Sequence, residues 1–216
     1  MIEIKLGSLF DVTDIWFASL FDGVSQPWDV LERIPHYIKA FPKDGFEELK
    51  KGVYVGKNVE IHPSAVIEAP CIIGAGCVIR QSAFIRGRVI TGENCVIGNS
   101  SEVKNSVLMN RVQLPHYNYA GDSVLGNFVH LGAGAICSNL KSDGENVIIH
   151  GENDMETNLR KLGAILGDRV EIGCNCVMNP GTVIGKSTSV YPLTSVRGVI
   201  PPDSIVKSTD NIVKRT

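Results

Sequence analysis

Residues 53–103 read VYVGKNVEIHPSAVIEAPCIIGAGCVIRQSAFIRGRVITGENCVIGNSSEV, and every sixth position in this stretch carries the same kind of side chain. Eight of the nine positions counted from Val55 are β-branched aliphatic: Val55, Ile61, Ile67, Ile73, Ile79, Ile85, Ile97 and Val103. The one exception is Thr91. The spacing resumes at Leu125 and Leu131, and again from Leu166 to Val196. The chain therefore contains a regular six-residue repeat.

A repeat of six residues suits one short strand and one turn, and it cannot bury its apolar side chain alone. Three such units make an 18-residue triangular coil, and successive coils pair as parallel strands roughly 4.8 Å apart. Small residues such as Ala65, Cys77 and Cys95 recur four positions after the aliphatic residue, where a tight corner is expected. The sequence therefore predicts an all-β fold, a parallel β-helix with aliphatic ladders inside.

The composition excludes several classes of function. The 216 residues carry a formal net charge of −2, which gives no electrostatic footprint for nucleic acid or an anionic membrane. There is no run of eighteen apolar residues, and the opening MIEIKLGSLFDV lacks the apolar region of a signal peptide. We expect a cytoplasmic protein. Cys174 and Cys176 form a C-x-C pair without a second pair, which is a weak metal signal.

Residues 1–52 lack the sixfold pattern and favour short helices at about 14–20, 27–34 and 44–51. Pro27 and Pro35 suit positions in the first turn of a helix. Trp16, Phe17 and Trp28 are among too many large apolar residues for a free tail. We expect this segment to cap the open end of the coil stack, with a docking surface for a partner as the alternative.

Two further regions interrupt the repeat. Between Val103 and Leu125 lies LPHYNYAGD (residues 114–122), in which His116 and Tyr119 are expected at an irregular corner. An imidazole there can accept a proton as a general base, or it can simply satisfy a turn. Residues 137–165 are polar and are expected to project outwards. They include a plausible anion-binding set, Asn139, Lys141, His150, Arg160 and Lys161, of which Lys141 and His150 are better explained as solvated loop residues.

The segment PHYNYAGDSVLGNFVHLGAGAICSNL (residues 115–140), followed by RKLGAILGDRVEIG (160–173), resembles the acetyltransferase half of bifunctional sugar nucleotide synthesis enzymes. Those enzymes acetylate glucosamine-1-phosphate and then join the product to a nucleotide. The resemblance implies a left-handed parallel β-helix, an acetyl-CoA cosubstrate, and a homotrimer with active sites between subunits. It makes residues 53–216 the acyltransferase domain, which includes the loop 137–165. The helical cap of residues 1–52 precedes this domain.

Matching the motifs residue by residue gives each candidate a role. The resemblance makes His116 the catalytic base and places Tyr119 beside the amino sugar. It assigns Arg86 and Lys104 to the sugar phosphate. The remaining matches are Asn139 on the substrate side and Ala133 and Cys174, whose backbone groups would meet the pantetheine arm of acetyl-CoA. No metal is required, because a thioester is already activated and the enzyme needs only to position and deprotonate the amine.

This chain departs from the family pattern in three respects. His130 stands where the family usually has Asn, and Ile148 falls where a loop lysine is expected, so that Lys161 or Lys141 would have to replace it. No Gly-rich G-x-G-T-R loop is present, and residues 1–52 are too few for a nucleotide-binding domain. We therefore expect any nucleotidyltransferase to be a separate protein. The acceptor stays open among a free sugar phosphate, a nucleotide amino sugar and another amine.

Two other classes of function remain possible from the sequence. A zinc enzyme of the carbonic anhydrase kind would need three converging histidines, drawn from His62, His116, His130 and His150 across subunits. A non-catalytic scaffold would use the N-terminal cap to hold a separate nucleotidyltransferase. The joint presence of Arg86, Lys104, His116, Tyr119 and Asn139 favours an enzyme, since a scaffold has no need of them.

Overall fold

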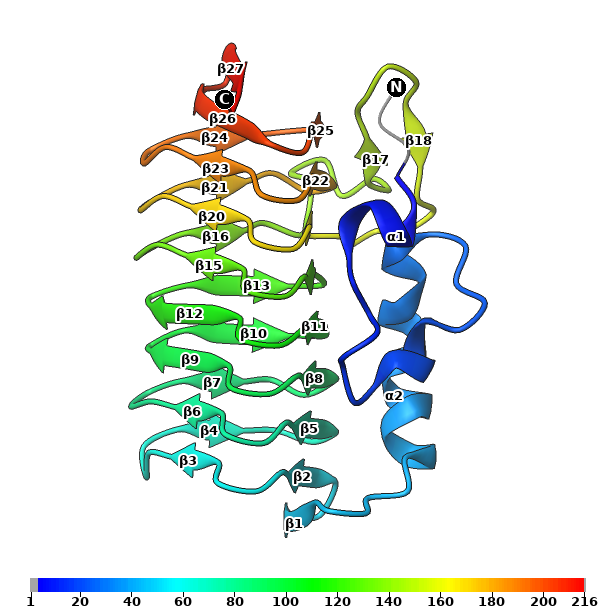
Figure 1. Ribbon diagram of the computed structural model, residues 1–216, viewed down its shortest axis with the longest axis vertical. Coiled ribbons are helices and arrows are strands. Elements are labelled where there is room, and N and C mark those ends of the chain that lie inside the picture. The colour runs from blue at the N-terminus through cyan, green and yellow to red at the C-terminus, as the bar shows by residue number, and fades with distance from the viewer. Residues whose placement is uncertain (1–3, 216) are drawn as a thin grey trace.

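The six-residue repeat folds into short strands that stack in three sheets, which form the three walls of a parallel β-solenoid in the computed structural model (Figure 1). The structure describes residues 4–215. Sheet A contains β2 (Val53–Val55), β5 (Cys71–Ile73), β8 (Val89–Thr91), β11 (Ser106–Leu108), β14 (Val124–Leu125), β19 (Ala164–Leu166), β22 (Thr182–Ile184) and β25 (Val199–Ile200), with β1 (Glu47–Lys50) antiparallel at its edge.

Sheets B and C complete each coil. Sheet B contains β3 (Glu60–Ile61), β6 (Val78–Ile79), β9 (Val96–Asn99), β12 (Gln113–His116), β15 (His130–Leu131), β20 (Glu171–Ile172), β23 (Ser189–Val190) and β26 (Ser204–Ser208), with β27 (Asn211–Lys214) antiparallel to β26. Sheet C contains β4 (Val66–Ile67), β7 (Phe84–Ile85), β10 (Glu102–Lys104), β13 (Tyr119–Gly121), β16 (Ile136–Cys137), β21 (Val177–Met178) and β24 (Ser195–Val196). The predicted all-β parallel solenoid is confirmed.

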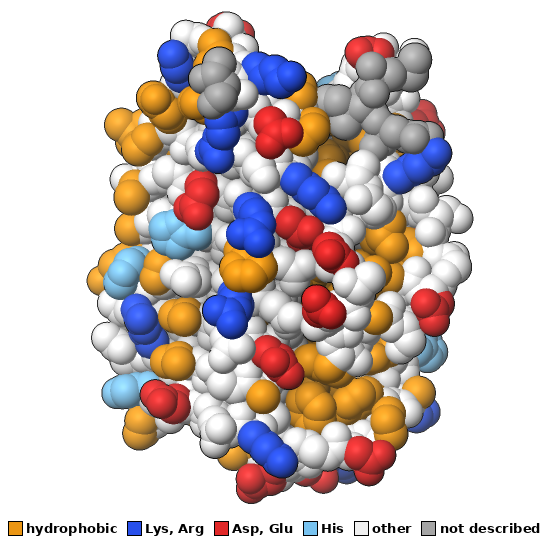
Figure 2. Space-filling view, viewed as in Figure 1, with side chains coloured by type: hydrophobic (Ala, Val, Ile, Leu, Met, Phe, Trp, Pro, Cys, Tyr) orange, Lys and Arg blue, Asp and Glu red, His pale blue; other side chains and the backbone are white. Residues whose placement is uncertain are grey.

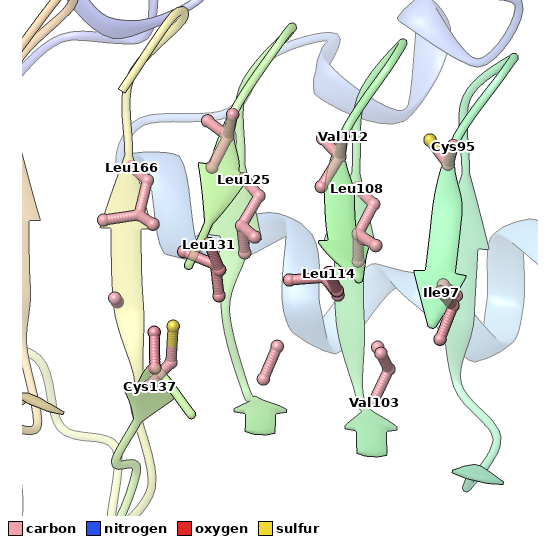
Figure 3. Close-up of a cluster of buried hydrophobic side chains, with 14 of the residues drawn as sticks. Cys95, Ile97, Val103, Leu108, Val112, Leu114, Leu125, Leu131, Cys137 and Leu166 are labelled. Atoms are coloured by element: carbon pink, nitrogen blue, oxygen red, sulfur yellow. The ribbon is translucent and has the colours of Figure 1, made fainter. Parts of the chain in front are cut away.

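The aliphatic positions of the repeat point into the solenoid and stack in ladders (Figure 3). Ile97, Val103, Leu108 and Leu125 are fully buried, as is Cys95 beside them. Burial raises the pKa of the Cys95 thiol well above its ordinary value, so this cysteine packs as a small apolar side chain.

The interruption predicted between Val103 and Leu125 is wrong. Val103 pairs with Ala120 one coil later, a step of 17 residues, whereas Ile85 pairs with Val103 at a step of 18. The ladder continues through Leu108, Leu114 and Ala120, all of them fully buried. These coils lack one residue at the corner between sheets C and A, so the sixfold count loses its phase although the coil is intact.

The N-terminal segment lies along a wall of the solenoid and not over its open end (Figure 1). It contains α1 (Leu6–Leu9), the 3₁₀ turns η1 (Ala18–Phe21) and η2 (Pro27–Asp29), and α2 (Val30–Ala40). Its side chains pack with outward-facing residues of sheet A: Ile72, Ile90, Val107, Val124, Ile165 and Val183. That wall is apolar on both faces, so it must be covered along its length.

The helices of this segment differ from the predicted ones. The helix around residues 27–34 continues to Ala40 with Pro35 inside it, because Ile34 and Ile38 are buried on its inner face. The helix predicted at 44–51 is wrong, since Glu47–Lys50 is strand β1. This strand pairs with β2 and covers the otherwise open edge of sheet A.

The loop of residues 137–165 leaves the coil stack and folds back against it. It contains the hairpin of β17 (Ile148–Ile149) and β18 (Met155–Glu156). Val147, Ile149 and Leu162 are buried in the same cluster as the N-terminal segment. The loop does project out of the coil as predicted, but its apolar side chains then rejoin the covered side of sheet A.

Candidate functional site

Four of the predicted substrate residues gather on sheet C and at its corner toward sheet A. Arg86 follows β7, and Lys104 ends the neighbouring strand β10, whose register continues into Gly121 of β13. Tyr119 stands beside Glu102 in the same register. Asn139 follows β16 on the next coil. Parallel pairing thus places side chains far apart in sequence on neighbouring coils of one wall.

Asp122 connects three of the polar side chains at this corner. Its side chain is almost fully buried and accepts hydrogen bonds from Asn139 Nδ2 and, at 2.6 Å, from Asn105 Nδ2. Lys104 Nζ lies 3.5 Å from Asp122 Oδ2. Asn105 and Asp122 both have positive φ, at the shortened corner where the coil lacks one residue. The missing residue therefore creates the geometry that fixes Lys104 and Asn139.

Arg86 has its own carboxylate partner, because its Nη1 lies 2.8 Å from Glu102 Oε1. This contact raises the pKa of the Arg86 guanidinium. Arg86 also lies over the Phe84 ring, with its Cζ 5.8 Å from the ring centroid. The guanidinium is thereby held in place while it still has N–H donors for a ligand.

Tyr119 lies over Gly121, and a side chain at residue 121 would collide with the tyrosine hydroxyl and with Asn139 Nδ2. Burial raises the pKa of Tyr119 above its ordinary value, and the negative charges of Glu102 and Asp122 raise it further. A hydrogen bond from Asn139 and the charge of Arg86 oppose this shift. The phenol is therefore neutral near pH 7 and can serve as a hydrogen-bond donor.

His116, Ala133 and Cys174 occupy one corner, between sheets B and C, on consecutive coils. The amide of Gly134 donates to the His116 carbonyl at 3.0 Å, and the amide of Asn175 donates to the Ala133 carbonyl at 2.8 Å. His116 ends β12 as an exposed side chain, and its own amide donates to Asn118 Oδ1 at 3.1 Å. The predicted base and the two predicted cofactor positions thus form a single column.

The residues that depart from the family pattern have separate environments. His130 Nδ1 lies 3.0 Å from Glu171 Oε2 on sheet B. Lys161 is exposed, and its backbone pairs with Leu140 beside Asn139, so the base of the loop brings it next to the site. Ile148 lies farther out in the loop, in the hairpin strand β17, which pairs with β18.

The two loop residues interpreted as solvated each have polar partners. Lys141 Nζ lies 3.1 Å from Asp143 Oδ2. His150 Nδ1 lies 3.0 Å from Asp154 Oδ2, and Arg197 Nη2 is 2.8 Å from His150 Nε2. Across residues 4–215, no three His, Cys, Asp or Glu side chains converge to hold a metal ion, so His62, His116, His130 and His150 form no site within one chain.

Sequence reasoning missed Asp122, Asn105 and Glu102 as parts of this site. The signal for Asp122 is present in the G-D of H-x-x-Y-x-G-D, next to the tyrosine. Asn105 gives no signal in isolation, because its contact with Asp122 depends on coil stacking. Glu102 lies one coil before Tyr119.

A family model described as bacterial transferase hexapeptide (six repeats) matches residues 52–87, and the coil pairing continues that repeat through residue 206. The chain carries the hexapeptide repeat that this family model describes. The described part of this hexapeptide-repeat protein contains no helix long and apolar enough to cross a membrane.

Relatives of this hexapeptide-repeat protein include the bifunctional protein GlmU of Methanococcus aeolicus, 31% identical over 212 residues, which are 95% of this chain and 52% of the relative. A bifunctional sugar-1-phosphate nucleotidylyltransferase/acetyltransferase of Sulfurisphaera tokodaii is 39% identical over 92 residues, covering 42% of this chain and 23% of the relative. The chain spans about half the length of GlmU from Methanococcus aeolicus.

Among solved structures, a UDP-N-acetylglucosamine acyltransferase from Campylobacter jejuni has a TM-score of 0.49 at 17% identity, covering 76% of this chain and 71% of that one. AntD, an N-acyltransferase from Bacillus cereus in complex with dTDP and 3-hydroxybutyryl-CoA, has a TM-score of 0.45 at 20% identity, covering 79% of this chain and 89% of that one.

Proposed function

We propose that this protein transfers the acetyl group of acetyl-CoA to the amine of an amino sugar phosphate, with His116 as the general base. The observation that carries the proposal is the column of His116, Ala133 and Cys174 at one corner. Tyr119 follows His116 by three residues, on the wall that holds Arg86 and Lys104. Tyr119 shares the coil of His116, Lys104 and Arg86 lie on the two preceding coils, and Ala133 and Cys174 lie on the two following ones.

The reaction needs one proton transfer and one acyl transfer. The amine nitrogen attacks the thioester carbonyl carbon, the new C–N bond forms, and the C–S bond breaks to release the CoA thiolate. His116 accepts the proton that the amine loses and can return it to the departing sulfur. Its exposed side chain at the corner is accessible to an incoming amine. Tyr119, whose phenol is neutral near pH 7, donates a hydrogen bond to the sugar.

The acceptor phosphate is assigned to Arg86 and Lys104. Both cations have carboxylate partners, Glu102 and Asp122 respectively, so neither is an isolated charge waiting for a ligand. Each still has N–H donors in excess of those contacts, since a guanidinium has five and an ammonium three. Lys161, at the base of the loop beside Asn139, is the proposed replacement for the lysine that the family has where this chain has Ile148.

The relatives support the assignment at the level of the reaction class. GlmU is named as a bifunctional protein, and the Sulfurisphaera relative is named as a nucleotidylyltransferase/acetyltransferase. The repeat region and the H-x-x-Y-x-G-D segment belong to the acetyltransferase resemblance. We therefore assign the chain to the acetyl-transfer step, acting as a homotrimer.

The test measures release of the CoA thiol from acetyl-CoA with a panel of acceptors: glucosamine-1-phosphate, glucosamine, and a nucleotide-linked amino sugar. We expect turnover with the phosphorylated acceptor and much less with the free sugar, because Arg86 and Lys104 would then lack their ligand. His116→Ala is the matched control. Thiol release with none of the acceptors, from folded protein, would favour the scaffold role in which the chain holds a nucleotidyltransferase.

A further inference from the structure

A groove lined by none of the residues assigned to acetyl transfer runs along the corner between sheets A and B. We call it the A/B groove, and its floor carries Arg111, Phe128, Arg169 and Lys186. The N-terminal segment forms the opposite side with Asp11 and Asp14. The hollow has a volume of about 630 Å³, and a second hollow of about 560 Å³ adjoins it and shares Arg111, Phe128 and Arg169. Volumes of this order fit small organic ligands.

The corner repeats one backbone geometry from coil to coil. Arg111, Phe128, Arg169 and Ser187 have φ values of 60°, 61°, 60° and 57°. The amide of Phe128 donates to the Asn110 carbonyl, and the amide of Arg169 donates to the Asn127 carbonyl. Equivalent backbone positions project their side chains in the same direction, so these side chains form a ladder along the coil stack.

Phe128 holds the two guanidinium groups in place. The Cζ of Arg169 lies 4.5 Å from the Phe128 ring centroid, and the Cζ of Arg111 lies 5.7 Å from it. The ring itself is 40% exposed. Guanidiniums held against an aromatic ring lose less freedom when a ligand binds than free arginine side chains do. The ladder therefore holds two preorganised cations, Arg111 and Arg169.

Several charged side chains around the ladder already have partners, whereas the two arginines and Asp14 have no ion pair with any residue that the structure describes. Lys186 Nζ lies 3.6 Å from Asp168 Oδ2, and the side chain of Asp11 accepts hydrogen bonds from Thr13. Within residues 4–215, neither arginine of the ladder has a carboxylate within ion-pair distance, and no Lys or Arg pairs with Asp14. Figure 2 shows basic side chains along the middle of this face and acidic ones toward the N-terminal segment.

We propose that the A/B groove binds a nucleoside diphosphate, with the diphosphate on Arg111 and Arg169. Two guanidinium forks present parallel N–H donors to phosphate oxygens. Asp14, across the groove, is an acceptor suited to ribose hydroxyl groups. The adjoining hollow contains the amides Asn94 and Gln113, which can meet the edge of a base. The acetyl-transfer site uses none of these residues, and nucleotide binding would give Arg111, Arg169 and Asp14 a function.

Nucleotide binding in the A/B groove does not require acetyl transfer to occur. Two kinds of molecule could supply the nucleoside diphosphate. The nucleotide part of acetyl-CoA and the nucleotide of a nucleotide-linked sugar both contain a nucleoside diphosphate. ADP and UDP therefore serve as the two probes, and inorganic pyrophosphate reports how much of the affinity comes from charge alone. Binding is measured by calorimetry without any acyl donor, so its outcome is separate from that of the turnover assay.

The variants are Arg169→Gln and Arg111→Gln, with Lys207→Gln as the matched control for loss of one exposed positive charge. Since a charged hydrogen bond contributes about 1.5–3 kcal/mol, each arginine variant should bind the nucleotide about tenfold more weakly or worse. Phe128→Leu should also weaken binding, because the guanidiniums lose their support. Lys207→Gln should bind like the wild type, and thermal melting checks that every variant is folded.

A loss confined to ADP would assign the groove to the donor, and a loss confined to UDP would assign it to a nucleotide sugar. Either result supports the proposal. Absence of nucleotide binding to the wild type, or equal affinity of the arginine variants and the wild type, would overturn it. Pyrophosphate binding as tight as that of both nucleotides would overturn the nucleoside part.

Discussion

His116 differs from Arg86, Lys104 and Asn139 because no side chain within residues 4–215 hydrogen-bonds to its imidazole. Arg86, Lys104 and Asn139 are each fixed by a carboxylate of the same chain. His116 is fixed only through its backbone, by Asn118 and by the stacked amide of Gly134. An unpartnered exposed imidazole suits a proton acceptor that must meet its substrate directly.

We predict that His116→Ala keeps its fold and lowers turnover by about 10² or more, the usual contribution of a general base. The side chain lies outside the buried ladders, so the melting temperature should change little. Steady-state rates and thermal melts on the same preparation make the comparison. Undiminished turnover by folded His116→Ala protein would remove the histidine from the mechanism.

Arg86 and Lys104 should respond differently to substitution, because they leave different partners behind. Glu102 stays solvated when Arg86 is removed, whereas Asp122, at 7% side-chain exposure, loses its nearest cation when Lys104 is removed. Both alanine variants should raise KM for the phosphorylated acceptor and leave acetyl-CoA affinity nearly unchanged. Only Lys104→Ala should also lower the free energy of unfolding, by about 1–3 kcal/mol. Equal weakening of both ligands would make these residues structural.

Tyr119 gives a prediction about pH. Its raised pKa, due first to burial and then to Glu102 and Asp122, means that the phenol ionises only above its ordinary range near pH 10. Because the folded protein favours the neutral phenol, this contribution to stability is present below about pH 10 and is lost as the pH rises through the raised pKa. The difference in tyrosinate absorbance between wild type and Tyr119→Phe should therefore appear late in an alkaline titration. An early step would contradict the donor role.

The N-terminal segment is a second hydrophobic core packed on sheet A. Phe17 is fully buried, and its ring centroid lies 4.9 Å from that of Trp16 in an edge contact. The same cluster includes Ile72 near one end of the solenoid and Val183 near the other. The segment therefore bridges most of the coils.

We predict that Phe17→Ala lowers the free energy of unfolding by about 3–5 kcal/mol, the usual cost of truncating a buried aromatic side chain. Leu49→Ala, at a residue 49% exposed, is the control and should stay within about 0.5 kcal/mol of the wild type. Denaturant melts monitored by circular dichroism give both values. A Phe17→Ala protein as stable as the wild type would show that the segment contributes nothing to the coils.

The sequence predicts the solenoid well, because each wall depends on local spacing of the kind seen from Val55 to Val103. The covered wall could also have been predicted. The residues just before the ladder on sheet A are Ile72, Ile90 and Val107, whereas on sheet B the equivalent residues include Glu60 and Gln113. The end-cap interpretation failed because it used the number of aromatic residues and not the pattern of the wall that they cover.

The candidate site was predicted residue by residue, but the contacts within it were not. The motifs identify Tyr119 and Asn139, and coil stacking brings them to the same corner. The contacts of Asp122 with Lys104 and Asn105 depend on a coil of 17 residues, and a count in sixes loses its phase there. The sixfold pattern fails at the corner where these side chains meet.

Two of the three walls, sheets B and C, are not covered by the N-terminal segment and can contact a second copy of the chain. Sheet A is covered by the N-terminal segment, while the corner between sheets B and C exposes Tyr117 (61%) and Leu193 (79%). Val66, at 52%, and Ile136, at 38%, add exposed apolar side chains on sheet C. The His116 column adjoins the exposed corner between sheets B and C, and the predicted substrate residues adjoin the exposed face of sheet C.

We predict a homotrimer, assembled through sheets B and C, whose active sites lie between subunits. Sedimentation equilibrium should give three times the chain mass of 23.4 kDa, and Leu193→Asp should shift the protein toward the monomer and reduce turnover with it. Leu49→Asp, on the edge strand β1, is the control. A wild-type monomer at micromolar concentration would remove the shared-site arrangement.

The N-terminal segment also has a consequence for how the chain is made. A ribosome releases this segment before the coils that it covers, and its partners on sheet A extend as far along the chain as Val183. Coils can stack one after another as they emerge, since each pairs only with its neighbours. The aromatic side chains of residues 16–46 therefore stay exposed to solvent until the wall that buries them has been synthesised. During translation this stretch therefore exposes apolar side chains that the folded protein covers.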